Sequence, residues 1–154
     1  MPPSPTVLPY CRTNAIAVLA YGALCRGLLS GKIRADSVFG GDDLRRVDPK
    51  FAQPRLGQYL QAVRRLDVLA RDRYNRSVLQ LAVRWILDKG ASSALWGARH
   101  PTQLDAVSGV AGWSLDVQAK AEIERILGEC ISDPVGPEFM APPPRSALDD
   151  LAIV

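Results

Sequence analysis

A chain of 154 residues is long enough for one domain with a hydrophobic core. Its 47% hydrophobic and 23% charged residues exclude the disordered and fibrous classes. The net charge of +3 is spread along the chain rather than gathered in one basic element, so composition does not indicate nucleic acid as a partner.

The first third of the chain predicts a short helix, one strand and a long loop. Residues 7–13 have room for one or two helical turns, and Asn14 is placed to end them. Residues 16–21 form an apolar, β-branched run that suits a parallel strand covered on both faces, with a buried helix as the alternative. Residues 22–54 carry several glycines and are expected to be irregular. A loop of this length is often a lid or a binding loop.

The middle of the chain predicts two helices and a second strand. Apolar residues recur at helical spacing over residues 56–74 and again over residues 77–88. Gly90 is placed to end the second of these helices. The short apolar run of residues 93–96 then predicts a strand.

The last part predicts two further helices and an irregular end. One helix is expected from Pro101 to a residue before Trp113. Residues 114–116 form a capping run for a last helix that continues through Cys130. The tail, residues 133–154, is too rich in proline to be regular.

Cysteine content and the first residues indicate the compartment. Cys11, Cys25 and Cys130 lack metal-ligand spacing, and the chain has a single histidine, so we expect free thiols and no metal site. The start of the chain does not have the pattern of a secretory signal, and its longest apolar run is too short to cross a bilayer. These features predict a cytoplasmic protein without a membrane partner.

The turn Gly97-Ala98-Arg99 is the most informative site candidate. It follows the strand predicted at residues 93–96 and leads directly into the helix predicted from Pro101. Such a junction directs backbone N–H groups and the positive end of a helix dipole to one place. The planar guanidinium of Arg99 matches a phosphate, which predicts a nucleotide ligand, and a solvated turn residue is the alternative.

Four stretches of the chain carry a family pattern. Residues 8–12 (Leu-Pro-Tyr-Cys-Arg) precede a strand and Gly-rich continuation at residues 18–32 (Val-Leu-Ala-Tyr-Gly-Ala-Leu-Cys-Arg-Gly-Leu-Leu-Ser-Gly-Lys). Residues 79–85 (Leu-Gln-Leu-Ala-Val-Arg-Trp) precede a second strand and turn at residues 95–104 (Leu-Trp-Gly-Ala-Arg-His-Pro-Thr-Gln-Leu). In this order and spacing, nearly the whole chain resembles the C-terminal portion of an NADP(H)-dependent aldo/keto reductase.

The resemblance implies an α/β fold that is only part of a (β/α)8 TIM barrel. The chain matches the seventh and eighth strands alone, and two strands cannot close a barrel. We therefore expect two parallel strands with a mostly helical remainder and open strand edges. This predicts a truncated or split form, whose partner is the missing N-terminal part of the barrel or another copy of the chain.

The resemblance also implies two loops that bind NADPH. The nicotinamide side of the cofactor and its pyrophosphate would run along the first loop, at Gly22, Ala23, Leu24, Cys25 and Arg26, with Lys32 close enough to supply charge. Gly97 and Arg99 would hold the 2′-phosphate, with Gln103 beside the adenine. The family's usual Ser-Pro is Gly22-Ala23 in this chain, and its later Glu and Asn are Ala106 and Val107.

The resemblance assigns no catalytic residue to this chain. The family uses an Asp, a Tyr that donates a proton, a Lys and a His, all on earlier strands, and no stretch here matches those strands. We expect a segment of an enzyme that reduces aldehydes or ketones to alcohols, carrying cofactor-binding residues only. A non-catalytic NADP-binding module and a helical interaction protein are the alternatives.

Overall fold

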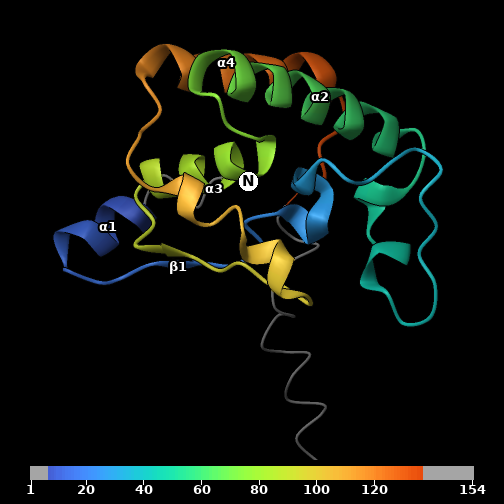
Figure 1. The fold of residues 1–154 in the computed structure, drawn as a ribbon, viewed down its shortest axis with the longest axis horizontal. Helices are drawn as coiled ribbons and strands as arrows, with labels where there is room; N and C mark the ends of the chain where they lie inside the picture. The colour runs from blue at the N-terminus through green and yellow to red at the C-terminus, as the bar shows by residue number, and fades with distance from the viewer. Residues whose placement is uncertain (1–6, 137–154) are drawn as a thin grey trace, which may run out of the picture.

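The structure is a computed structural model that describes residues 7–136. The expectations for residues 1–6 and for residues 137–154 of the proline-rich tail therefore lie outside the described residues. Helix α1 (Val7–Thr13) confirms the first predicted helix, and Asn14 ends it by donating its backbone and side-chain amides to a carbonyl of the last turn. Helix α1 buries no side chain and lies at one end of the molecule (Figure 1).

Three layers organise the rest of the described chain (Figure 1). Helix α2 (Arg55–Tyr74) packs against α4 (Val117–Cys130) and also against α3 (Val78–Asp88). Helix α3 in turn covers the pair formed by strands β1 (Leu19–Ala20) and β2 (Ser93–Ala94). The predicted fold class is confirmed, because two parallel strands form an open sheet within a mostly helical chain.

The strand pair is shorter and more exposed than predicted. Leu19 pairs with Ser93 and Ala20 with Ala94, so only two residues of the apolar run 16–21 form β1. The prediction of cover on both faces is wrong, because Leu19 is 65% exposed and Leu95 is 51% exposed. Helix α3 packs against β2 of the pair.

Short-range signals define the three long helices. Ser77 caps α3 by accepting from the backbone N–H of Gln80 at 3.4 Å, and Gln80 Oε1 accepts from the Ser77 N–H at 3.0 Å. Asp116 caps α4 by accepting from the backbone N–H of Ala119 at 2.8 Å. Asn75 ends α2 in the left-handed conformation, with φ of 51°. The predicted helices at residues 56–74, 77–88 and 116–130 are confirmed within two residues.

The hydrophobic core lies where α2, α3 and α4 meet. Each helix contributes one apolar stripe, as the spacing predicts. Full burial of a leucine-sized side chain stabilises the fold by about 1.5–3 kcal/mol. None of the helices in the described part of the chain has the length and apolarity needed to cross a membrane. The central buried side chains are Leu56, Leu60, Val63, Leu66, Ala70, Val78, Leu81, Ala119, Ile123 and Ile126.

The prediction of a single helix from Pro101 is wrong. Two short 3-10 helices, η4 (Pro101–Leu104) and η5 (Ser108–Val110), occupy this segment. In an α-helix the carbonyl of Ala106 would accept from the N–H four residues later. Here it accepts from Gln80 Nε2 at 3.0 Å and from the N–H of Gly109 at 3.2 Å, so the tighter winding replaces the helix.

The long loop contains three short 3-10 helices, η1 (Cys25–Ser30), η2 (Leu44–Arg46) and η3 (Pro49–Phe51). Asp43 caps η2 by accepting from the backbone N–H of Arg45 at 2.9 Å. The side-chain hydrogen bonds from Arg45, followed by its backbone bond, lower the pKa of Asp43 to about 2, and the charge of Arg99 adds to this effect. The loop is therefore ordered by local ion pairs and lies within electrostatic reach of the turn after β2.

We predict that the Asp43 carboxyl titrates near pH 2 in an NMR measurement and that Arg45→Ala moves the midpoint up toward about 3.9. Arg99→Ala should raise it by less. Because folding depresses this pKa, the stabilisation it provides is present above pH 4 or so and is lost as the pH falls toward 2. A midpoint near 3.9 in the unchanged chain would contradict the ordered loop.

Candidate functional site

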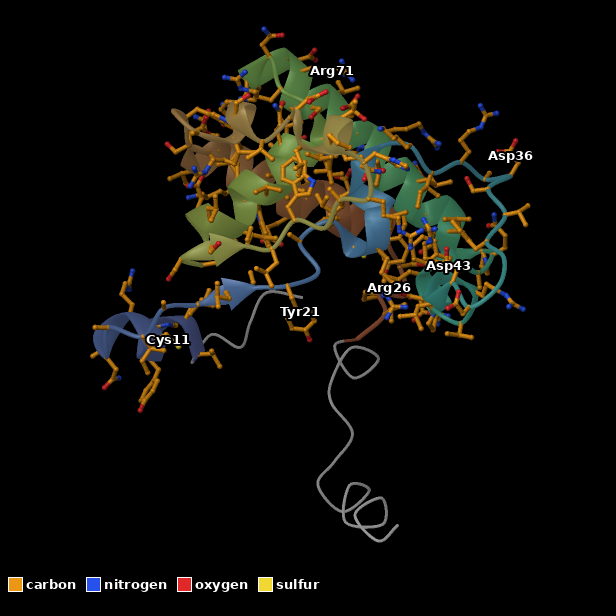
Figure 2. All side chains as sticks on the ribbon, turned by 60° about the horizontal axis from the view of Figure 1, so that its bottom comes forward. Cys11, Tyr21, Arg26, Asp36, Asp43 and Arg71 are labelled. Carbon is orange, nitrogen blue, oxygen red and sulfur yellow. The ribbon has the colours of Figure 1, made fainter. Side chains whose placement is uncertain are left out.

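The carboxyl ends of β1 and β2 meet at one edge of the strand pair. The strands are parallel, so the loop that follows β1 and the turn that follows β2 leave at the same side (Figure 1). Helix α1 with Cys11 lies away from this edge, whereas Tyr21 and Arg26 lie along it (Figure 2). Ligands of α/β folds bind at the carboxyl ends of parallel strands.

The loop after β1 has a tightly wound backbone. Gly22 and Gly27 adopt φ of 72° and 87°, and between them Cys25 and Arg26 also have positive φ, of 49° and 53°. The N–H of Cys25 donates to the carbonyl of Gly22 at 2.8 Å, which closes the first turn. Consecutive left-handed residues without glycine are costly, so surrounding contacts must hold them.

Arg26 is held by the long loop. Its guanidinium Nη1 donates to the carbonyl of Leu44 at 3.0 Å and lies 3.5 Å from Asp48 Oδ2. The Asp48 carboxylate is 1% exposed, and its other oxygen lies 2.8 Å from Lys50 Nζ. A buried carboxylate requires such cations, so the three side chains fix the start of the long loop, directly after β1, against residues 44–50 of the same loop.

Cys25 lies within this loop but is not an activated thiol. Burial raises its pKa, and the lowering effect of the nearby Lys50 ammonium is smaller. Burial therefore disfavours the thiolate, which is the reactive form of a cysteine. All three cysteines of the chain are free, and no group of three or more His, Cys, Asp or Glu side chains gathers as a metal site within residues 7–136.

The turn after β2 presents Arg99 to solvent. Gly97, Arg99 and Gln103 are all exposed, and no atom lies within 4 Å of the position that a Cβ would take at Gly97. Within the described residues, the Arg99 guanidinium makes no hydrogen bond and no ion pair. This turn therefore offers an available planar cation beside open space.

The backbone of the same turn differs from the prediction. Gln103 Oε1 accepts from the N–H of Arg99 at 2.6 Å and from that of His100 at 3.2 Å. These two donors are therefore satisfied within the chain, and the helix that follows has only four residues. The expected contribution of a helix dipole is wrong, because a helix this short has little dipole, and Arg99 supplies the charge of the turn.

The structure brings most of the predicted cofactor residues to one edge. Gly22 to Arg26 and the turn with Gly97, Arg99 and Gln103 follow the two paired strands. Lys32 follows η1, is exposed and uses its N–H to bind Ser30 Oγ at 3.2 Å. The sequence did not predict the role of Asp48 in holding Arg26. An Asp directly before Pro49 indicates only the start of a short helix, which is η3.

The hollows on the described surface lie elsewhere. Two of them, of about 430 and 400 Å³, lie against α2. Arg64 and Val68 line both, the first hollow together with α4 and the second together with Ser30 and the start of α3. Neither hollow is lined by Arg26 or Arg99 at the carboxyl edge of the strand pair.

Comparison with known proteins places these features in one family. The family model described as "Aldo/keto reductase family" matches residues 2–128. The aldo-keto reductase YhdN of Bacillus subtilis (strain 168) is 57% identical over 144 residues, which are 93% of this chain and 44% of that protein. The NADH-specific methylglyoxal reductase of Escherichia coli (strain K12) is 34% identical over 99 residues, which are 64% of this chain and 29% of that protein.

Solved structures give the same result. The glycerol dehydrogenase AKR11B4 from Gluconobacter oxydans matches with a TM-score of 0.78 and 48% identity, over 88% of this chain and 41% of that one. The chain thus spans less than half the length of the relatives it matches. It belongs to the aldo/keto reductase family.

Proposed function

We propose that this chain carries the cofactor-binding part of an NADPH-dependent aldo/keto reductase that reduces aldehydes or ketones to alcohols. One observation carries the proposal: the exposed Arg99 guanidinium and the wound loop after β1 lie at the same edge of the parallel strand pair. Members of the family typically use NAD(P)H. The names of two relatives point to different cofactors, NADP(+) for the yakc protein of Schizosaccharomyces pombe and NADH for the Escherichia coli enzyme.

The residues at this edge fit a dinucleotide with a 2′-phosphate. Arg99 would pair with that phosphate through two parallel N–H groups, and the open space at Gly97 would admit it. Gln103 would keep the turn in shape beside the adenine, since its Oε1 already binds the backbone of Arg99.

The first loop suits the other half of the cofactor. Leu24 has φ of −102° and ψ of 10°, and Cys25 follows with a positive φ, so the chain turns sharply after β1. This sharp turn would leave room for the pyrophosphate along the loop. Gly22, Ala23 and Arg26 complete this loop, and Lys32 adds an exposed cation beyond it. When bound, the reduced nicotinamide supplies the hydride for the carbonyl.

The proton donor and its partners would come from the part of the barrel that the relatives have in addition. Leu19, Tyr21 and Leu95 are more than half exposed at the strand pair. Leu19 and Tyr21 share one face, since alternate residues of a strand do. An uncovered apolar strand face requires a further layer, and the missing strands of a barrel would provide it.

We predict that Arg99→Ala weakens NADPH binding by about 10- to 100-fold, the equivalent of losing charge-assisted bonds of about 1.5–3 kcal/mol. NADH binding should stay unchanged, because NADH has no 2′-phosphate. Fluorescence titration of both cofactors measures this, with Arg12→Ala as a control that removes one exposed charge from α1. Equal losses for NADPH and NADH would refute the assignment of Arg99.

We also predict that the chain alone does not oxidise NADPH in the presence of aldehydes or ketones. Adding the N-terminal part of the Bacillus subtilis relative that this chain does not cover should form a complex that co-purifies and turns over. Turnover by the chain alone would contradict the proposed division of residues. A stable complex that binds NADPH without turnover would instead establish a non-catalytic binding module.

A further inference from the structure

Gln80 uses both ends of its amide to join two parts of the fold. Its Oε1 accepts from the backbone N–H of Ser77 at 3.0 Å, at the first turn of α3. Its Nε2 donates to the carbonyl of Ala106 at 3.0 Å, between η4 and η5. The side chain is partly buried, so these bonds are shielded from water.

The hydrogen bond from Gln80 to Ala106 also depends on Gly109, which lies directly beside the Gln80 amide. A Cβ at Gly109 would overlap Nε2 of Gln80, so this position accepts glycine alone while the amide stays in place. The carbonyl of Gly109 accepts from Trp113 Nε1 at 2.9 Å, which holds the far end of the same segment. The segment from Ala106 to Gly109 is therefore bonded to α3 at Ala106 and to Trp113, which follows η5, at Gly109.

Hydrogen bonds between residues close in sequence connect the region of Ala106 back to Arg99. The N–H of Val107 donates to the carbonyl of Leu104 at 2.9 Å, and the N–H of Gln103 donates to that of His100 at 3.0 Å. Gln103 Oε1 then binds the N–H of Arg99. With so few residues between Ala106 and Arg99, a shift of the anchor would move the turn that carries the guanidinium.

We infer that Gln80 is a positioning residue for Arg99. Through Ala106 it determines how strongly the turn after β2 binds a 2′-phosphate, and so how far the chain prefers NADPH to NADH. The second part rests on the function proposed above. Gln80 lies on α3 and touches neither the turn nor the proposed cofactor. Its effect is to hold the η4–η5 segment in register with the carboxyl end of β2.

Gln80→Glu separates this role from helix capping. A carboxylate keeps the acceptor for the Ser77 N–H, and a negative charge in the first turn favours α3. It has no donor for the Ala106 carbonyl, so only the anchor is lost. Gln61→Glu, at an exposed position of α2, is the matched control for the change of charge.

In the full 154-residue chain, Gln80→Glu should raise hydrogen exchange at residues 99–110 by roughly three- to tenfold, with α3 and α4 unchanged. The ratio of NADPH to NADH affinity should fall by a similar factor. Unchanged exchange at residues 99–110, or a uniform rise across the chain, would overturn the inference. So would a local rise that leaves an existing preference for NADPH intact.

A second pair of variants tests the contact itself. Gly109→Ala should give the same local rise in exchange, because its methyl group displaces the Gln80 amide, and it should have little further effect in a Gln80→Ala background. Additive effects would overturn the anchor. A local rise in a chain that never prefers NADPH would support the anchoring by Gln80 and refute the function proposed for Arg99.

Discussion

The parallel pairing of β1 with β2 is the constraint on which the rest of the site depends. Leu19 pairs with Ser93 and Ala20 with Ala94. Further bonds join the N–H of Leu95 to the Ala20 carbonyl at 2.8 Å and the N–H groups of Ser92 and Ser93 to the Val18 carbonyl at 2.9 and 3.1 Å. This short ladder joins segments more than seventy residues apart and turns both loops to one edge. Without it, the first loop and Arg99 would have no fixed relation.

Helix α3 connects this edge to the hydrophobic core. It packs against β2 and α2, and it anchors the η4–η5 segment through Gln80. On the other side of the site, the buried Asp48 holds Arg26 and so joins the start of the long loop, directly after β1, to a later part of the same loop. The turn after β2 is thus held by a polar contact from α3, and the loop after β1 by polar contacts from a later part of the same long loop.

Local signals explain what the sequence predicts well. The apolar stripe of α2 and the caps Ser77 and Asp116 act over a few residues, and they define the helices within two residues. The position of the Gly97-Arg99 turn after a strand is equally local. The split of the helix predicted from Pro101 has another origin, because it depends on Gln80, which lies 26 residues from Ala106 in sequence. The setting of Arg26 also depends on distant partners, Leu44 and Asp48.

The central claim is that Arg99 contacts the 2′-phosphate of NADPH, and ³¹P NMR tests it most directly. When the full chain is added to NADPH, the 2′-phosphate resonance should shift, and the pKa of that phosphate should fall below its free value of about 6, because a guanidinium favours the dianion. The pyrophosphate resonances should shift as well. Shifts of the pyrophosphate alone, with the 2′-phosphate titrating as in free NADPH, would contradict the account.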